Sequence, residues 1–432
     1  MVPVRTGVVT AALGLLMTVG LVSPAHAADP APSNVMVAWA NTAHTHVRVT
    51  WSETGSVPNR VFPQYAGGLG WLTSVPASAG NQVDLPVSQF DTAPMVRVAV
   101  YVGGNESTSP AGVSTAFDTL LRGTPVVDSL TAAARNQFTM KWHAGAEPVD
   151  PNPGDPLDLT PGPHRFQVYA SLAKVSIWDL MVDAGTATSA TFTPTQAAPI
   201  SVSVRDYNEW SDSYAAAGVD VDTERFRSLT VPAATTYGQP TVITGQLQRS
   251  TRLCGAGLCW AEDVAEPSRP VVLHARADAA APWYVVGVVQ STATGTFRFA
   301  PVAWGTRQYR VAVPDQFGSG SLGLGVISGA STTLTRPSVR GSFTDSTVTY
   351  SQRVTTRVTL APPANVRTTL QRWDGQAWRD LKWVSTSNGV GTYTFTATQR
   401  GRFAYRYLVP AFSYGGRPLS WQVSANFVLT TS

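Results

Sequence analysis

The sequence predicts an all-β protein, a tandem array of four β-sandwiches that follows a cleaved export signal. Three observations support this prediction. Short segments alternate apolar and polar residues along the chain, Gly and Pro clusters separate them, and two pairs of internal repeats divide the chain into four parts. With 36 Gly and 31 Pro among 432 residues, the chain is rich in turns but lies below the range of disordered proteins.

The charge of the chain is low and nearly balanced. Charged residues make up 13% of the sequence, about half the usual share, and the formal net charge is +4. This composition excludes a charged coiled coil and a polyelectrolyte tail. So weak a positive charge does not indicate nucleic-acid binding, and no nucleic-acid partner is expected.

Residues 1–27 have the pattern of a signal peptide. Arg5 precedes an apolar run from Val8 to Val22, and Ala25-His26-Ala27 places small residues around a cleavage point after Ala27. The run is shorter than the roughly 20 residues that a membrane-spanning helix needs, although a retained N-terminal anchor is the alternative. We therefore expect a secreted, extracellular protein without membrane insertion, whose mature chain begins at Ala28.

Period-two alternation marks the strands. Residues 47–51 and 138–142 each alternate apolar and polar side chains and end in Trp, and residues 96–100 alternate in the same way. Such a strand places one side on a core and the other in water. Residues 172–182 alone compete as a helix, but their β-branched residues keep a strand open.

The first half of the mature chain contains one repeat pair. Trp51 and Trp142 close equivalent strands 91 residues apart, whereas Arg60 and Arg165 are 105 residues apart. The second copy therefore carries 14 extra residues, which we place in the Pro- and Asp-rich stretch 147–163 as a loop.

The second half contains a clearer pair. Tyr237-Gly-Gln corresponds to Tyr350-Ser-Gln at an offset of 113, and Tyr309-Arg-Val-Ala-Val-Pro to Tyr405-Arg-Tyr-Leu-Val-Pro at 96. The earlier copy thus holds 17 extra residues after Leu247.

The repeats give a domain plan. After the signal peptide (1–27), the expected sandwiches span residues 28–120, 121–225, 226–333 and 334–432. The segments that join them are short, near residues 119–124, 222–227 and 331–337, so we expect limited rather than free hinging.

Residues 30–225 resemble fibronectin type III domains. The similarity lies in the early strand that ends in Trp51 or Trp142 and in a late Val-x-Val strand followed by an Asn-Glu bend at Asn105 or Asn208. Residues 226–432 resemble bacterial immunoglobulin-like repeats of secreted proteins. These resemblances imply immunoglobulin/fibronectin type III-like sandwiches used as spacers, adhesion units or binding units beside extracellular enzymes, and they carry over no catalytic residues.

Cys254 and Cys259 are the two cysteines of the chain. Export favours a disulfide between them, and the intervening glycines let the chain fold back. A metal site needs two further ligands that the neighbourhood lacks, and a redox motif has a shorter spacing. Because both lie in the 17-residue insertion, the disulfide should brace a protruding loop.

The sequence contains no recognisable catalytic motif. The histidines form no His-Glu-x-x-His pattern, and no Gly-x-Ser-x-Gly elbow occurs. His44 and His46 share a strand face and Asp150–Asp158 is rich in oxygen ligands, yet a solvated pair and a Pro-stiffened loop explain them better than a metal. We therefore expect no catalytic residue, no cofactor and no resident metal.

Thirteen tryptophans raise the question of sugar binding. Four recur at equivalent positions of the repeats and are expected to be buried: Trp51, Trp142, Trp283 and Trp378. Four others are less regular and are the candidate ligand-binding aromatics on an exposed face: Trp71, Trp210, Trp260 and Trp304. Residues 371–383 mix Arg and Trp, but a hairpin with a two-residue Asp374-Gly375 turn explains them better than nucleic-acid binding.

The leading functional hypothesis is a secreted, non-enzymatic protein that acts as an extracellular binding, adhesion or spacer protein. Its partner is unknown, with a cell-surface polysaccharide or another extracellular protein as candidates. Two alternatives stay open: a carbohydrate-binding module that presents Trp on one face, and an extracellular glycosidase-associated enzyme, which needs two acids facing each other across a groove.

Overall fold

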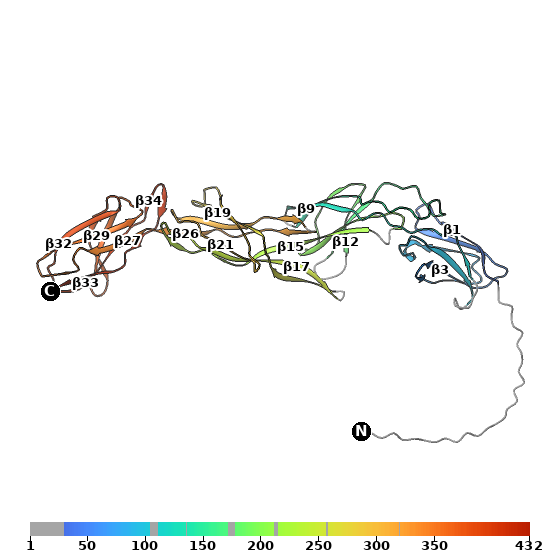
Figure 1. Ribbon diagram of the computed structural model, residues 1–432, viewed down its shortest axis with the longest axis horizontal. Helices are drawn as coiled ribbons and strands as arrows, with labels where there is room; N and C mark the ends of the chain where they lie inside the picture. The colour runs from blue at the N-terminus through green and yellow to red at the C-terminus, as the bar shows by residue number, and fades with distance from the viewer. Residues whose placement is uncertain are drawn as a thin grey trace, which may run out of the picture. The chain divides into compact units, whose positions relative to one another are not determined.

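A computed structural model describes residues 30–103, 111–134, 136–171, 178–210, 215–255, 258–318 and 320–432. Over these residues the chain forms β-strands and one short 3-10 turn but no α-helix, as the ribbon in Figure 1 shows. The predicted fold class, an all-β array of immunoglobulin/fibronectin type III-like sandwiches, is confirmed. The predicted signal peptide and the bend at Asn105 lie outside the described residues, as do residues 172–177 of the ambiguous segment 172–182, whose last five residues belong to a strand.

The first sandwich has the following elements: β1 (Ser33–Trp39), β2 (His46–Ser52), β3 (Asn59–Tyr65), β4 (Gly68–Leu69), β5 (Thr73–Val75), β6 (Gln82–Pro86), the 3-10 turn η1 (Val87–Gln89), β7 (Arg97–Val102) and β8 (Ala111–Val113). One sheet has the order β1-β2-β6, and the other has the order β4-β3-β7-β8 with β5 beside β3. In β2, buried Val47, Val49 and Trp51 alternate with polar residues, as the sequence pattern predicts.

The second sandwich has the following strands: β9 (Val126–Ala134), β10 (Gln137–His143), β11 (Phe166–Ser171), β12 (Trp178–Gly185), β13 (Ser189–Phe192), β14 (Ile200–Asp206) and the first half of β15 (Ala215–Thr230). Its sheets run β13-β10-β9 and β12-β11-β14-β15. The equivalent strands of the first sandwich have the same neighbours, so the first repeat pair is a repeat of topology.

The third sandwich has the following strands: the second half of β15, β16 (Ala234–Thr236), β17 (Ile243–Gly255), β18 (Leu258–Ala265), β19 (Pro270–Arg276), β20 (Tyr284–Gln290), β21 (Thr296–Phe299), β22 (Arg307–Val313), β25 (Val326–Ile327) and β26 (Ser331–Arg336). A hairpin of β23 (Gln316–Gly318) and β24 (Ser321–Leu324) follows β22. One sheet has the order β16-β26-β22-β19-β20.

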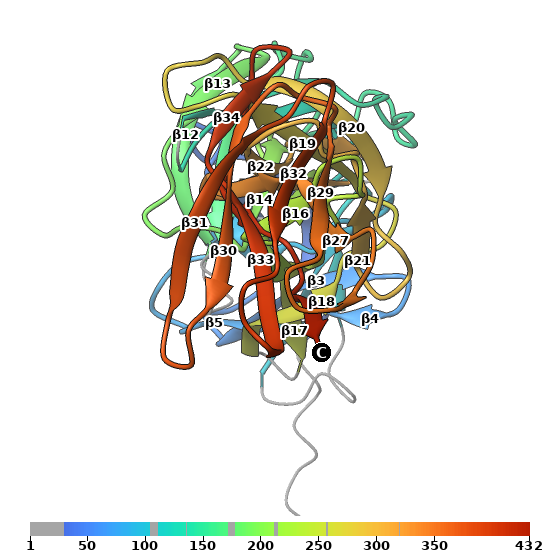
Figure 2. The same cartoon turned by 90° about the vertical axis from the view of Figure 1, so that its left-hand side faces the viewer.

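The fourth sandwich has the following strands: β27 (Ser338–Phe343), β28 (Thr347–Val348), β29 (Arg353–Ala361), β30 (Arg367–Trp373), β31 (Trp378–Ser385), β32 (Val390–Thr396), β33 (Gly401–Val409), β36 (Gln422–Val423) and β37 (Phe427–Thr431), with a hairpin of β34 (Phe412–Tyr414) and β35 (Arg417–Leu419). Its layers have the orders β28-β37-β33-β30-β31 and β27-β29-β32. Figure 2 labels β30, β31 and β33 of the first layer and all three strands of the second. The first order matches that of the third sandwich strand for strand.

The repeat signature Tyr-x-Gln has a structural basis. Gly238 and Ser351 both have a positive φ, at 78° and 69°. Each is the third residue of a four-residue turn whose last residue, Gln239 or Gln352, donates its backbone N–H to the carbonyl of the first, Thr236 or Thr349. The 113-residue offset therefore superimposes two identical turns, and Gly is the residue best suited to the left-handed position.

The described residues separate into two compact units. Residues 148–161 and Trp210 belong to the unit of residues 30–121, although the sequence assigned them to the second sandwich. Their side chains explain this: Leu157 and Trp210 are buried in the first core, and the Trp39 Nε1–H donates to the Leu157 carbonyl at 3.0 Å. The Pro-rich stretch is thus a packed strap in which Leu157 is an anchor, instead of a free loop.

Residues 222–227, the expected interdomain segment, lie inside β15 at the point where its partner changes from β14 to β17, so the segment is a strand and not a linker. The two-residue turn predicted at Asp374-Gly375 was wrong. The turn at Asp374-Gly375 spans four residues between Trp373 and Trp378, because the Asp374 side chain accepts hydrogen bonds from the backbone N–H groups of Gln376 and Ala377.

Candidate functional site

The candidate ligand-binding tryptophans have different environments. Trp71, Trp260 and Trp304 are 73%, 45% and 47% exposed. Trp210 is only 6% exposed, so its prediction as a solvent-facing ring was wrong. It packs against Phe117, with ring centroids 6.3 Å apart, and it completes the first core. The burial of Trp210 could not be predicted from the sequence, because a Trp beside a predicted bend has no strand pattern that indicates which way its ring points.

The recurring tryptophans also separate into two groups. Trp51 and Trp142 are buried, at 5% and 2% exposure, as expected. Trp283 and Trp378 are half-buried, because they lie on the outer face of a sheet under arginine side chains. Arg310 lies over Trp283 at 4.4 Å, and Arg406, 96 residues later, lies over Trp378 at 4.3 Å. The repeat therefore conserves a surface Arg–Trp stack, which alternation alone cannot distinguish from a core position.

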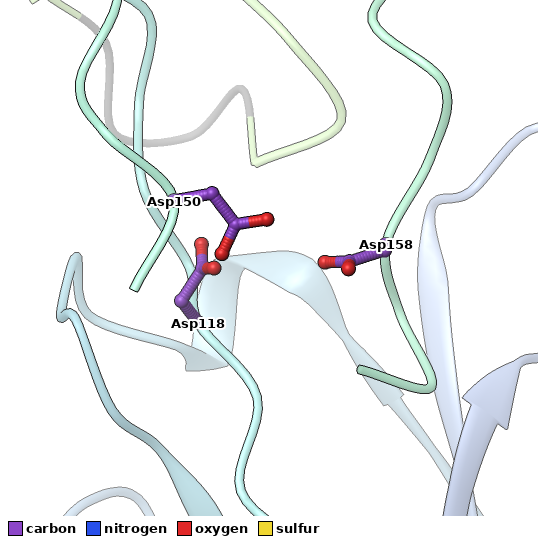
Figure 3. A group of neighbouring side chains, drawn as sticks. All are labelled: Asp118, Asp150 and Asp158. Carbon is purple, nitrogen blue, oxygen red and sulfur yellow. The ribbon is translucent and has the colours of Figure 1, made fainter. Parts of the chain in front are cut away.

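Three carboxylates meet in the first unit. Figure 3 shows Asp118, Asp150 and Asp158 pointing toward one another, and one oxygen of each lies within 4.8 Å of the others. Asp118 comes from the end of the first sandwich, so the sequence, which pointed only to residues 150–158, missed it. Burial raises the pKa of Asp118 to about 6, with a further rise from the neighbouring Asp150 and Asp155.

The hydrogen bonds of this acidic cluster explain its shape. The Asp150 side chain accepts from the Asn152 N–H at 2.7 Å, and the Asp158 side chain accepts from the Asp155 N–H at 3.0 Å. Asp155 in turn accepts from the Asp118 N–H at 2.9 Å. Oxygen ligands of this kind suit Ca²⁺, which takes six to eight of them. The same carboxylates act as local caps that fix the strap.

The two cysteines lie opposite each other near the tip of the hairpin β17–β18. Cys254 and Cys259 form a disulfide, with Cα atoms 4.0 Å apart. The next pair, Leu253 and Trp260, is 38% and 45% exposed. The predicted bracing of a protruding insertion is therefore present in the structure. His44 and His46, the other candidate metal pair, are both half-buried, and His46 Nδ1 is 3.0 Å from the Thr45 hydroxyl.

The second and third sandwiches share a joint. The hairpin β23–β24 places Ser321–Leu324 parallel to residues 220–223 of β15. Leu322 is 2% exposed and belongs to the core of the second sandwich, although the rest of its hairpin follows a strand of the third. A continuous strand and an inserted hairpin thus connect the two sandwiches.

Arg269 fixes this hairpin to β15. Its guanidinium donates to the Glu224 carboxylate, to the Gln316 side chain and, at 2.9 Å, to the Pro314 carbonyl. Arg269 and Glu224 are only 5% and 6% exposed. The planar fork of an arginine can satisfy several acceptors at once, so one side chain holds the strand and the start of the hairpin together.

Further carboxylates surround this pair. Asp222 and Glu266 lie 3.5 and 3.1 Å from Arg249. Burial raises the pKa of Glu224 to about 7, although Arg269 opposes the rise. Burial likewise raises the pKa of Asp222 and of Glu266. The joint therefore contains three carboxyl groups whose pKa burial raises, Glu224 the most clearly.

The third and fourth sandwiches meet through the equivalent hairpin, β34–β35. The Thr306 N–H donates to the Pro418 carbonyl at 2.9 Å, and the Ser420 N–H donates to the Thr335 carbonyl at 2.8 Å. Gly305 lies so close to the Arg417 side chain that a Cβ there would be 2.6 Å from it. A glycine is therefore required at this contact.

Three cavities in the described residues have volumes of about 390, 430 and 210 Å³. No Asp or Glu side chain lines any of them.

The part of the chain that the structure describes contains no helix that is long and apolar enough to cross a bilayer.

Comparison with known proteins finds no match by sequence and only distant similarity to solved structures. No protein family and no curated protein matches the sequence. The chain is similar, at 12% identity, to a tetra-tandem repeat in the extending region of a large adhesion protein, over 92% of this chain and 99% of that one with a TM-score of 0.22. It is also similar, at 12% identity, to a Ca²⁺-stabilized adhesin that helps an Antarctic bacterium bind ice, over 94% and 100% with a TM-score of 0.20. A third is the chicken CNTN1 FN1–FN3 domains, at 11% identity, 72% and 99% coverage and a TM-score of 0.19. At these values the similarity does not extend to function.

Proposed function

We propose that the protein is a secreted, non-enzymatic array of β-sandwiches that serves as an extracellular spacer and adhesion protein of bacterial immunoglobulin-like type. The observation that carries the proposal is the joint at β15, where one strand belongs to two sandwiches in turn. A spacer has to keep its modules at a fixed separation, and a shared strand does this better than a flexible linker.

The three described cavities do not have the lining of a glycosidase site. Glycoside hydrolysis needs two carboxyl groups that face a sugar across a cleft. The three cavities described above lack such groups. The carboxylates of the acidic cluster accept hydrogen bonds from nearby backbone N–H groups: Asp118 from Leu120, Asp150 from Asn152 and Asp158 from Asp155.

Spin labels in the second and third sandwiches test the spacer. We would label Thr131→Cys together with Thr332→Cys, both on exposed positions, in the full mature chain. No free cysteine of the described residues would compete for the label. A rigid joint predicts a pulsed-EPR distance distribution as narrow as that of a control pair inside the third sandwich, Thr294→Cys with Thr332→Cys. A distribution several times broader than the control would contradict the proposal.

Export has its own test. Mass spectrometry of the protein recovered from the culture medium should give a chain that starts at Ala28. Retention of residues 1–27 on cell-associated material would overturn the proposed secretion.

A further inference from the structure

The charge of the chain is divided unevenly. From β27 to the last residue, positions 338–432 hold eleven Lys and Arg but only three Asp and no Glu. Positions 1–337 hold twenty Lys and Arg against 24 Asp and Glu. The overall charge of +4 therefore hides a strongly basic fourth sandwich after an acidic body.

Part of this charge gathers on one flat face. In β29, Val354, Thr356 and Val358 point into the core, so Arg353 and Arg357 point outward. Arg340 of β27 is opposite Thr359, which shares the outward side. We call this surface, made by Arg340, Arg353, Arg357 and the threonines between them, the Arg–Thr face.

The strand register sets the spacing of these arginines. Arg353 and Arg357 are four residues apart on one strand, which is about 13 Å. Arg340 and Arg357 are diagonal neighbours on adjacent strands, about 7–8 Å apart. The strand register therefore sets the backbone spacing of three exposed cations on the Arg–Thr face.

No acid neutralises these cations. The strands β27, β29 and β32 contain neither Asp nor Glu, and no ion pair within the described residues involves Arg340, Arg353 or Arg357. All three side chains are exposed. Like charges without counter-charges on one rigid surface attract an anionic partner from solution.

Hydroxyl groups accompany the arginines. Thr392, Thr394 and Thr396 of β32 are exposed on the same side, opposite Arg357, Thr355 and Arg353. The Thr355 and Thr394 hydroxyls are hydrogen-bonded at 2.8 Å, so the row is ordered. Arginine binds carboxylate and sulfate groups, and hydroxyls can exchange hydrogen bonds with sugar hydroxyls.

We propose that the Arg–Thr face binds an acidic polysaccharide. The face carries no aromatic ring on which a nucleotide base could stack, and Val390 at its edge is its single exposed apolar side chain, too little to anchor in a membrane. The third sandwich lacks the pattern, because Pro240 and Thr244 occupy the positions of Arg353 and Arg357 at the offset of 113. The binding site would therefore belong to the fourth sandwich alone.

This inference rests on the proposed extracellular function for its choice of ligand. Its test is nevertheless separate from the test of the spacer. The Arg–Thr face lies within the fourth sandwich, so it is present whether the joint between the second and third sandwiches is rigid or flexible. Polysaccharide binding and the spin-label distances can therefore succeed or fail independently.

Affinity chromatography of the full mature chain tests the proposal. We would pass it over immobilised heparin, immobilised polygalacturonate and neutral dextran. Retention on the two acidic polymers that is lost as salt increases, with none on dextran, is expected. Arg340→Gln/Arg353→Gln/Arg357→Gln should weaken binding to heparin at least tenfold.

A matched control separates the face from net charge. Arg97→Gln/Arg227→Gln/Arg298→Gln removes the same charge from exposed positions of other sandwiches and should change affinity less than twofold. The proposal would be overturned if both triple variants lost the same affinity for heparin, or if the Arg340/Arg353/Arg357 variant kept the affinity of the wild type. Tighter binding of the wild type to single-stranded DNA or to phosphatidylglycerol vesicles than to both acidic polymers would also overturn it. Arg357→Glu alone repeats the test if the triple variant is unstable by circular dichroism.

Discussion

The third and fourth sandwiches carry the same hairpin but dock it by different chemistry. β23–β24 follows Val313-Pro314 and β34–β35 follows Val409-Pro410, at a constant offset of 96. The first hairpin adds a parallel strand to β15 and buries a leucine in the preceding core. The second contacts the preceding sandwich through two backbone hydrogen bonds and one ring contact, between Tyr414 and Tyr237.

The difference shows that the same hairpin, repeated in two sandwiches, can stabilise their contacts with the preceding sandwich to different extents. Both hairpins bury a leucine, Leu322 and Leu419, so burial of apolar area does not distinguish them. The first joint has in addition a parallel strand pairing with β15 and the buried Arg269–Glu224 pair, whereas two backbone hydrogen bonds exchanged with water contribute little net free energy. We therefore expect the joint between the second and third sandwiches to be the stronger one. Each prediction below challenges this ranking.

The largest effect is expected at the buried pair. Arg269→Met leaves the Glu224 carboxylate buried without its partner, which should cost about 3–5 kcal/mol. Arg249→Met, at a position whose side chain is 34% exposed, is the matched control and should cost less. Calorimetry of the full chain measures both.

A double variant sharpens this result. Arg269→Met/Glu224→Met removes both charges and should recover most of the lost stability, because the unpaired charge is the source of the cost. If the single variant Arg269→Met melts like the wild type, the pair does not hold the joint.

The next largest effect is expected at Leu322, which the hairpin β23–β24 inserts into the core of the second sandwich. Leu322→Ala should destabilise the second sandwich by about 2–5 kcal/mol, because it leaves a cavity in that core. Leu419→Ala in the equivalent hairpin, at a residue that is also 2% exposed, is the matched variant, and the proposed ranking of the joints predicts the smaller cost for it. A larger loss for Leu419→Ala in urea unfolding would reverse the ranking of the joints.

The joint should also respond to pH. A carboxyl whose pKa is raised in the folded state, to about 7 for Glu224, binds a proton more readily when folded than when unfolded. Its contribution to stability is therefore complete below about pH 4 and is lost as the pH rises through 7. Melting temperatures should fall from pH 5 to pH 8.

Glu224→Gln isolates this group. Asp118, whose pKa is raised to about 6, gives a change of the same sign in the other compact unit, so the two have to be separated. The Gln variant should show a flatter pH dependence of melting than the wild type. If the melting temperature of Glu224→Gln depended on pH as steeply as that of the wild type, a group other than Glu224 would cause the pH dependence.

The smallest effect is expected at the disulfide. Cys254 and Cys259 close a loop of few residues at the hairpin tip, for which the chain-entropy estimate is about 2 kcal/mol. Cys254→Ala/Cys259→Ala should leave both joints unchanged, because the tip lies beyond the strand segments that form them. Thiol titration of the denatured, unreduced protein should find no free thiol, and two reactive thiols would contradict the bridge.

The sequence could predict what depends on local pattern. Alternation identified strands such as β2 and β10, and repeat offsets identified equivalent turns and the insertion that carries Cys254. It could not predict partners that are distant along the chain. Trp210 and Leu157 looked like loop residues because the core they complete belongs to another part of the chain.

The functional surfaces were hidden for a related reason. Asp118 joins Asp150 and Asp158 across more than thirty residues, so no spacing rule could have linked them. The basic fourth sandwich was masked by an acidic body when charge was summed over the whole chain. Counting charge for each sandwich separately would have revealed it.

Hydrogen exchange across β15 tests the shared strand most directly. If β15 is one strand in two sandwiches, the backbone amides of residues 219–229 exchange slowly throughout, with no faster step at residues 222–225. Rapid exchange of those central amides between two protected ends would mean that a linker separates the sandwiches after all.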